Sequence, residues 1–532
     1  MSHESFDHIV IGSGSGGGVV AARLTEDPDV RVLLLEAGPM DDDDMIHLPA
    51  GFSTLFKTKW DWGYQTSAQK HLGGRRADWP RMKGLGGCTS MNAMIYIRGN
   101  AADYDEWRDA YGAQGWGYED VLPYFKRSEG NTSRRDEYHG TDGPLHVEDR
   151  RFTHELSHAF VEAGVAAGFK RNDDFNGAEQ EGVGQYQVTC RKGRRWSVAD
   201  AYVRPAMSRP NLTVRTDALV TSIDLEGEGD ATRAVGVTYR RAGVTETVRA
   251  NGEVVLAGGA INSPQLLMLS GIGPAAHLRE HGIDVRVDLP GVGQNLQDHP
   301  TSGVLAHTQN TSDVAESLNL GGLLKAQKLG RGPLTSNVGE AGGFFRSRPD
   351  LDLPDLQFHF APTGFWDNGL HEATHPALTL VATLVRVHSR GHVRLRSADP
   401  TWKPEIDPQY LDDPADLEAL THGVRRACEV LRTAPLTGFV KAPWLPRTLD
   451  PSDAEIVDSI AHLGQTLYHP VATCAMGTGD DSVVDEALRV RGVRGLRVAD
   501  ASVMPTVPRG NTNAPTVMIG EKAADLIKEE SR

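Results

Sequence analysis

The first fifty residues place the strongest constraint on the fold, because they follow the order strand, glycine turn, helix and strand. An apolar run from Phe6 to Ile11 leads directly into the glycine-rich turn 12–17, and a second apolar run, Val30 to Leu35, ends at Glu36. In a G-x-G-x-x-G turn the glycines allow a tight bend, a close approach of the backbone to a pyrophosphate, and close packing of helix on strand. This order predicts a Rossmann-like unit.

Four residues of this unit are candidate ligands of an adenine dinucleotide. Gly12, Gly14 and Gly17 lie where a helix begins, and the free N–H groups and dipole of a helix N-terminus favour a phosphate. Glu36 follows about 20 residues later, where its carboxylate can accept hydrogen bonds from a ribose hydroxyl. The turn alone does not distinguish NAD from FAD, and similar turns also occur as plain linkers.

Length and charge narrow the class of protein. A chain of 532 residues exceeds the size at which a single core stops growing, so we expect two domains. The net charge of −16 argues against nucleic acid or an anionic membrane as the main partner. No apolar run reaches the 18 or so residues of a membrane-spanning helix. The first strand starts too early to leave room for a signal peptide, so we expect a cytoplasmic protein.

The cysteines give no sign of a cross-linked or metal-bound fold. Cys88, Cys190, Cys428 and Cys474 are far apart and form no C-x-x-C pair. Neither a disulfide framework nor a metal site is therefore expected.

Two further stretches have the composition of binding loops or strands. Residues 81–99 combine paired glycines with short polar side chains such as Asn92, which suits a second contact with a diphosphate or ring, although an ordinary loop has the same composition. Residues 211–223 and 234–239 predict strands of a small antiparallel unit, and 253–257 predicts a buried strand.

The C-terminal part supplies two polar candidates at predicted helix ends. Ser452 and Glu455 form a capping box, and the helix that follows is expected to stop at His469, because the next residue is proline. Asn513 precedes a final helix, predicted from 517 to 528. Each residue has an ordinary alternative: a packed or surface histidine, and an N-cap asparagine.

Four separated motifs, taken together and in this order, resemble the glucose–methanol–choline (GMC) oxidoreductase family over essentially the whole chain. They are residues 82–99, 259–273, 469–474 and 510–524. The resemblance implies an α/β (overall α+β) GMC fold, in which a Rossmann-like FAD-binding domain is interleaved with a substrate domain built on an antiparallel sheet. It assigns residues 1–155, 195–300 and 455–532 to the FAD-binding domain, and residues 156–194 and 301–454 to the substrate domain.

The resemblance also implies which residues contact FAD. They are Gly12, Gly14, Gly17 and Glu36 at the ADP half, Val220 at the adenine, Gly87 and Asn92 on the diphosphate and flavin side, Asp500 and Ala501 near the diphosphate, and Asn513 to Thr516 near the pyrimidine ring. Choline oxidases link FAD covalently through a histidine where this chain has Met91. We therefore expect FAD to be bound without a covalent bond.

By the same resemblance His469 matches the catalytic base and Asn513 its partner, which orients the alkoxide oxygen. His359 matches a histidine in the pocket of choline oxidases, and Phe365 and Trp366 are expected to give the substrate pocket apolar walls. The glutamate that contacts the trimethylammonium group of choline is replaced by Thr301, which disfavours choline. The resemblance thus predicts the oxidation of uncharged primary alcohols, aryl or medium-chain alkyl, to aldehydes.

Two alternatives remain open from the sequence. One is a choline dehydrogenase or oxidase. The other belongs to a different class, because some proteins of this fold are hydroxynitrile lyases that keep FAD without using it for redox chemistry. The electron acceptor, O2 or a quinone, the choice between oxidase and dehydrogenase, and the oligomeric state are not determined by the residues.

Overall fold

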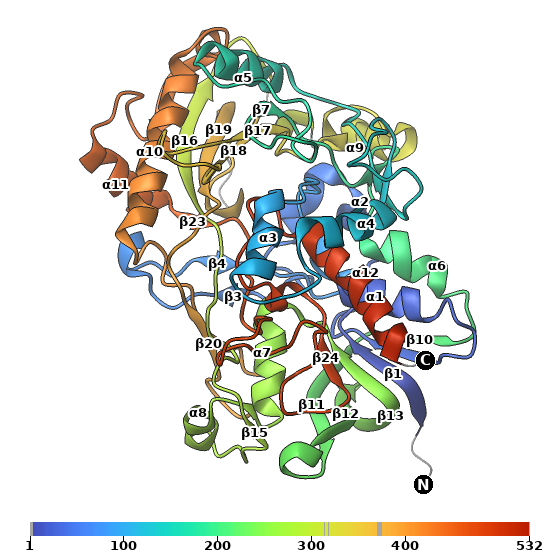
Figure 1. Ribbon diagram of the computed structural model, residues 1–532. Coiled ribbons are helices and arrows are strands. Elements are labelled where there is room, and N and C mark those ends of the chain that lie inside the picture. The colour runs from blue at the N-terminus through green and yellow to red at the C-terminus, as the bar shows by residue number, and fades with distance from the viewer. Residues whose placement is uncertain (1–3, 313, 318, 370–374, 531–532) are drawn as a thin grey trace.

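Two large sheets organise the chain in the computed structural model, which describes residues 4–312, 314–317, 319–369 and 375–530. The first sheet lies in the lower part of Figure 1 and the second in the upper part. The first has the strand order β10-β2-β1-β13-β12-β11, and β24 also pairs with β13. Its strands are β1 (Ser5–Ile11), β2 (Val32–Leu35), β10 (Leu212–Arg215), β11 (Ala218–Glu226), β12 (Arg233–Arg241), β13 (Val244–Leu256) and β24 (Leu496–Val498).

The first sheet is parallel at its centre and antiparallel at one side. β1 pairs in parallel with β2 and β13, and β10 and β24 extend this parallel part. Residues 211–223 therefore do not form one strand of an antiparallel unit as predicted. The chain turns at Asp217, which has a left-handed φ of 54°, so β10 joins the parallel strands and only β11 and β12 are antiparallel.

Helices α1 (Gly17–Leu24) and α12 (Asn513–Glu530) run side by side against this sheet (Figure 1). The two helices approach closely at Gly520, where a Cβ atom would lie only 2.7 Å from the carbonyl oxygen of Gly16. Glu521 of α12 is buried and accepts hydrogen bonds from Arg23 of α1 and from Arg127 of α4 (Tyr118–Ser128). α12 begins four residues earlier than predicted, which places its N-terminus beside the glycine turn.

The second sheet is antiparallel throughout its described pairs and has the order β22-β16-β19-β18-β17-β7, with β23 also on β16. Its strands are β7 (Gly182–Gln185), β16 (Pro300–Thr308), β17 (Ala341–Phe345), β18 (Leu356–Ala361), β19 (Ala377–Leu384), β22 (Val440–Leu445) and β23 (Gln465–Thr466). Helices α5 (Glu155–Ala166) and α10 (Pro414–Arg432) cover one face. β23 comes from the segment assigned to the FAD-binding domain, and the domain boundaries themselves stay a prediction.

The remaining elements connect and flank these two layers. The other helices are α2 (Asp44–His47), α3 (Ala101–Asp109), α6 (Arg204–Ala206), α7 (Gly259–Leu269), α8 (Ala275–Glu280), α9 (Leu320–Leu329) and α11 (Asp453–Leu463). Short two- and three-residue strands form hairpins or pairs at β3 (Tyr64–Gln65) with β4 (Asp78–Trp79), β5 (Glu129–Asn131) with β6 (Leu145–Val147), β8 (Cys190–Arg191) with β9 (Arg194–Arg195), β14 (Ile272–Gly273) with β15 (Val287–Asp288), and β20 (His392–Arg394) with β21 (Glu405–Asp407). Within the described residues, no helix has both the length and the apolar character needed to cross a membrane.

Helix α11 begins as predicted and ends earlier than predicted. The side chain of Ser452 accepts a hydrogen bond from the backbone N–H of Glu455, which confirms the capping box. The helix ends at Leu463 because the chain leaves Gly464 with extended geometry and continues as β23, which pairs with β16. His469 therefore lies in a loop after a strand and not at a helix end.

Candidate active site

One cavity, with a volume of about 370 Å³, is lined by residues of both large sheets. The predicted site residues that line it are Gly12, Gly14, Glu36, Gly87, Asn92, Val220, His359, Phe365, His469, Asp500, Ala501, Asn513 and Thr516. Among the predicted residues that the structure describes, Gly17, Trp366, Ala514 and Pro515 are outside this lining. The structure thus brings the dinucleotide candidates and the candidate base to one place.

The floor of the cavity's dinucleotide side is a pair of glycine turns in contact. Gly12 has a left-handed φ of 96°, and a Cβ atom there would lie 2.4 Å from the carbonyl oxygen of Ala257. A Cβ atom on Gly87 would lie 2.7 Å from Cα of Gly14, so the two turns touch through glycines. Gly17 has the packing role of the third glycine, because its Cβ position is filled by Gly12 and Val10.

Glu36 directly follows β2, at the rim of the glycine turn. Its carboxylate is buried and accepts hydrogen bonds from the backbone N–H of Ser13 at 3.1 Å, the hydroxyl of Ser13 at 2.6 Å and the N–H of Gly38 at 2.9 Å. Burial raises the pKa of Glu36, while these hydrogen bonds lower it. The same carboxylate therefore holds the turn in shape and lines the cavity.

The C-terminal segment closes the dinucleotide side. Asp500 accepts hydrogen bonds from the N–H of Gly259 and the hydroxyl of Ser263, so it ties β24 to the start of α7 while lining the cavity. Asn513, the first residue of α12, accepts a hydrogen bond of 2.8 Å from the hydroxyl of Ser15. Its side chain is thereby fixed to the glycine turn.

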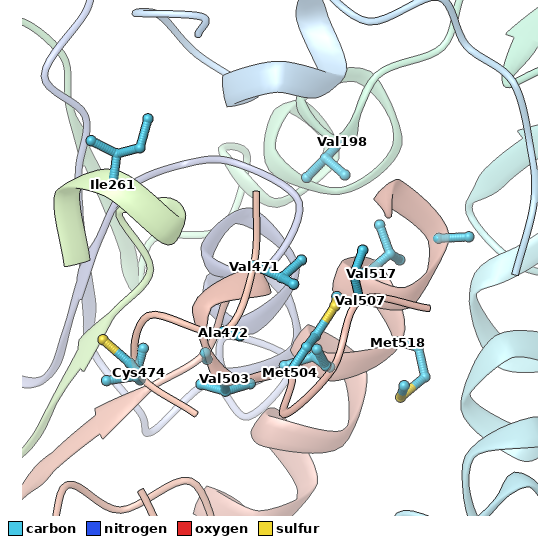
Figure 2. Packing of buried hydrophobic residues seen from close by; sticks show 14 of the residues in the cluster. Val198, Ile261, Val471, Ala472, Cys474, Val503, Met504, Val507, Val517 and Met518 are labelled. Carbon is cyan, nitrogen blue, oxygen red and sulfur yellow. The ribbon is translucent and has the colours of Figure 1, made fainter. Parts of the chain in front are cut away.

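Buried apolar packing and one aspartate hold the loop of His469. Figure 2 shows side chains that follow His469 packed with residues of 503–507 and of α12: Val471, Ala472, Cys474, Val503, Met504, Val507, Val517 and Met518. Asp298 accepts a hydrogen bond of 2.7 Å from the backbone N–H of His469. The other Asp298 oxygen accepts from Thr466, at 2.6 Å, and from Tyr410. These contacts stabilise a backbone in which Tyr468 has an unfavourable φ of 68°.

The imidazole of His469 has a partner at each nitrogen. Its Nδ1 lies 3.0 Å from Nδ1 of His299, and its Nε2 lies 3.3 Å from Nδ2 of Asn511. The Asn511 oxygen accepts from Nε2 of Gln357 at 3.4 Å, so its amide nitrogen is the atom that donates to His469. Nε2 of His469 is then the hydrogen-bond acceptor. The neutral ring carries its proton on Nδ1, and this N–H group donates a hydrogen bond to His299.

The contact with His469 comes from Asn511 instead of Asn513. The two asparagines are separated by one residue at the start of the final helix, and Asn513 is turned toward Ser15. The sequence motif contains both, and no local pattern ranks them. Only the register of this loop against the loop of His469 decides which side chain meets the imidazole.

Burial keeps His469 and the histidines near it neutral. Burial lowers the pKa of His469 well below its ordinary value, and His299, His359 and Arg81 lower it further. Burial also lowers the pKa of His299 to about 3 and that of His359 to about 3. An unprotonated Nε2 on His469 is therefore the ground state at neutral pH, as a general base requires.

The alternation of strands β18 and β19 directs His359 to the cavity side of the second sheet. Phe358 and Phe360 pack on Phe160 of α5, so His359 lies on the opposite face. Its Nδ1 lies 3.2 Å from the hydroxyl of Thr383, which donates to Thr301. His359 is thus fixed by a polar relay within the sheet.

The walls near His469 are apolar and aromatic. Phe365 lies 5.8 Å from Phe52 between ring centres, and Phe56 lies 5.9 Å from Tyr468. All four side chains line the cavity. Trp366, predicted beside Phe365, packs instead on Trp444 at 6.2 Å between ring centres and does not line the cavity.

Arg81 is a cavity residue to which the sequence motif gave no role. Its guanidinium lines the cavity with His469 and contributes to lowering the pKa of that histidine. Its Nε and one Nη are buried without a hydrogen-bond partner among the described residues. A buried cation with free donors is a site for an anion or a polar ring, and the arginine at the head of the 81–99 motif was the available signal.

Two clusters outside the cavity contain metal-ligand residue types. They are Asp41 with His47 and Asp200, and Asp136 with His139 and Asp174. Arg204 pairs with both carboxylates of the first cluster. In the second, His139 bridges Glu129 and Asp174. Because Arg204 pairs with the carboxylates of the first cluster, and His139 and Arg134 pair with Asp174 of the second, neither cluster supports a metal proposal.

Comparisons with known proteins find similar sequences and similar solved structures. Two sequence models described as GMC oxidoreductase match residues 6–301 and 387–520. An alcohol dehydrogenase (acceptor) of Pseudomonas putida is 44% identical over 98% of this chain and 95% of its own, and an oxygen-dependent choline dehydrogenase of Brucella anthropi is 42% identical over the same shares. Among solved structures, pyridoxine 4-oxidase from Mesorbium loti is 32% identical with a TM-score of 0.90 over 99% of both chains. Formate oxidase of Aspergillus oryzae is 28% identical with a TM-score of 0.92 over 100% of this chain and 99% of that one.

Proposed function

The chain belongs to the GMC oxidoreductase family, and we propose that it oxidises uncharged primary alcohols, aryl or medium-chain alkyl, to aldehydes with His469 as the base. The observation that carries the proposal is a neutral, buried His469 whose Nε2 accepts a hydrogen bond in the same cavity as a double glycine turn. The alcohol dehydrogenase of Pseudomonas putida, similar over nearly the full length, supports the alcohol as substrate class.

Enzymes of this family depend on FAD, and the cradle fits such a dinucleotide. A Cβ on Gly12 or Gly87 would collide with neighbouring backbone, so side chains are excluded where a pyrophosphate must approach. Gly14, Glu36, Asn92, Val220 and the 500–516 segment would hold the rest of the molecule. When bound, FAD supplies the acceptor for the hydride. Met91 lines the cavity at the position of the linking histidine, which supports non-covalent binding.

The residues of this chain manage the proton and the oxygen. Nε2 of His469 takes the hydroxyl proton, and His299 accepts a hydrogen bond from the Nδ1–H group and so keeps the ring in the correct tautomer. The amide of Asn511 donates to the oxygen that becomes negative, which is the role first expected for Asn513. Asn513 and Thr516 stay as proposed contacts of the pyrimidine side.

Choline is the second candidate substrate. Phe52, Phe56, Phe365 and Tyr468 surround the cavity and aromatic faces attract quaternary ammonium groups. The choline dehydrogenase relative supports this alternative. Two residues argue against choline. Thr301 stands where choline oxidases have a carboxylate, and its hydroxyl donates to the carbonyl of Ala382. The buried guanidinium of Arg81 in the cavity would repel a second cation.

Anaerobic mixing with benzyl alcohol, 1-hexanol and choline tests the proposal. We expect the visible absorbance of the flavin to bleach with the two uncharged alcohols and not with choline. Recolouring in air then distinguishes an oxidase, which recovers fast, from a dehydrogenase that needs an acceptor such as a quinone. Bleaching by choline alone would transfer the assignment to choline oxidation. Cyanide release from mandelonitrile without any bleaching would replace the oxidoreductase by a lyase.

A further inference from the structure

Helix α9 exposes three large apolar side chains on the surface of the protein. Leu320 is 74% exposed, Leu324 47% and Leu329 65%. Leu320 and Leu324 are four residues apart and so share one face of the helix. The opposite side is anchored, because Ala326 is buried in a small cluster with Leu48 and Leu334. The exposed leucines are thus held in place by a helix that is packed on the body of the protein, at its upper right edge in Figure 1.

Cations surround these leucines. Lys325, Lys328 and Arg331 are exposed, and the sequence from Asn319 to Gly339 contains no acidic residue. None of these three cations forms an ion pair with another described residue. This composition stands out in a chain with 71 acidic and 55 basic residues.

A neighbouring hairpin extends the basic surface. Gly330 at the end of α9 touches the hairpin of β8 and β9, and a Cβ atom on Gly330 would lie 2.2 Å from the carbonyl oxygen of Lys192. Exposed Lys192 is therefore adjacent to the end of α9. The carboxylate in contact with this hairpin, Glu148, accepts from the backbone N–H of Gly193 and pairs with Arg151, so it does not neutralise Lys192.

We propose that this α9 surface, consisting of Leu320, Leu324, Lys325, Lys328 and Arg331, docks on an anionic lipid bilayer. An amphipathic helix with leucines beside lysines lies in the membrane interface, where the apolar side chains enter the acyl boundary and the cations bind headgroup phosphates. The net charge of −16 predicts that the molecule as a whole is repelled by an anionic membrane. At physiological ionic strength, however, repulsion from carboxylates beyond about 8 Å is screened, so the local charge decides.

The charge of this surface argues against a second copy of the chain as its occupant. A twofold contact through α9 would place the same cations opposite one another, because each copy presents the same residues. Like charges brought together in this way oppose association. An anionic bilayer supplies the opposite charge and an apolar layer at once.

Docking would bring the wall of the catalytic cavity close to the bilayer. Leu48 and Ala50 contact the α9 side of this region, and Phe52 and Phe56, in and next to the 3₁₀ helix Pro49–Leu55, line the cavity. Apolar alcohols and lipid-soluble quinones concentrate in membranes. The cavity of the proposed alcohol oxidation would then lie close to the phase that holds its reactants.

Cosedimentation with vesicles tests the proposal on the FAD-loaded, full-length protein. We expect binding to vesicles of phosphatidylcholine with phosphatidylglycerol, weaker binding to phosphatidylcholine alone, and loss of binding as salt is raised. Each cation near an anionic surface strengthens binding about fivefold, so the triple variant Lys325→Glu, Lys328→Glu and Arg331→Glu should weaken it at least ~100-fold. The matched variant Arg240→Glu, Arg279→Glu and Arg494→Glu changes the net charge equally at other exposed sites and should bind like the wild type.

A second pair of variants tests the leucines. Leu320→Ser with Leu324→Ser should weaken binding to the anionic vesicles by about tenfold or more, since each removes an inserted side chain. Met207→Ser with Val244→Ser removes exposed apolar side chains elsewhere and should have no effect. All four variants should oxidise alcohols in solution at the wild-type rate, because none of these residues lines the cavity.

Three results would overturn the membrane proposal. The first is failure of the wild type to bind the anionic vesicles. The second is binding of the triple α9 variant as strong as that of the wild type. The third is a change of oligomeric state in the triple variant on size-exclusion chromatography, while the wild type does not bind vesicles. The last result would assign the surface to contacts between copies.

Discussion

The two halves of the cavity are built in different ways. The dinucleotide half consists of glycine turns that contact backbone atoms, as where Gly14 meets Gly87. The alcohol half depends on side chains from distant loops: His299 and His469 are 170 positions apart, and Asn511 comes from a third segment. A backbone cradle needs only the correct residue type. A side-chain pocket also needs the register of every loop that contributes to it.

The largest effect is expected in the backbone half, from Gly87→Ala. The new Cβ would lie 2.7 Å from Cα of Gly14 and would separate the two turns, so the purified protein should lack FAD and all oxidation activity. Gly243→Ala is the matched control, because Gly243 also has a left-handed φ, of 79°, but nothing within 4 Å. It should keep FAD and lose only about 1 kcal/mol of stability. The flavin-to-protein absorbance ratio checks both, and an FAD-loaded Gly87→Ala would refute the cradle.

The next effect separates two asparagines of the side-chain half. Asn511→Ala removes the donor beside His469 and should slow anaerobic flavin reduction by roughly 100-fold with FAD retained. Asn513→Ala breaks the bond with Ser15 and should slow reduction by less than about tenfold. Stopped-flow measurement with benzyl alcohol compares the two. The reverse order would return the partner role to Asn513.

A smaller effect concerns pH. His469 acts as a base only when neutral, so the rate should fall only where the pH drops below its lowered pKa, well under the ordinary value for histidine. His299 is the second-largest cause of that lowering, after burial. Replacing it in His299→Gln should therefore raise the pKa of His469 and move the acid limb of kcat/KM to higher pH. An unshifted or downshifted limb would show that His299 does not act on the base.

The smallest effect concerns the apolar wall. Phe365→Ala enlarges the cavity and should raise KM for 1-hexanol by about tenfold. Trp366→Ala, one residue later, removes a side chain that packs on Trp444 and should change KM by less than about twofold. Steady-state kinetics with one alcohol compares them, and equal effects would place both side chains in the pocket.

What the sequence could predict follows the same division. The glycine turns, the run of β1 and the capping box of Ser452 are local patterns, and each was found where its pattern placed it. The partner of His469 is two residues earlier than the resemblance implied, because only long-range register brings Asn511, and not Asn513, to the ring. The end of α11 was also placed too late. Pairing of β23 with β16 is a contact between remote segments, which periodicity does not reveal.

The most direct test of the central claim is the rate of anaerobic flavin reduction by benzyl alcohol in His469→Ala. Because the variant removes the only proposed acceptor of the hydroxyl proton, the rate should fall by roughly 1,000- to 10,000-fold while the FAD content stays that of the wild type. His462→Ala, whose side chain is 71% exposed on α11, serves as the control and should reduce at the wild-type rate. A His469→Ala protein that keeps its FAD and is reduced as fast as the wild type would contradict the assignment of His469 as the base.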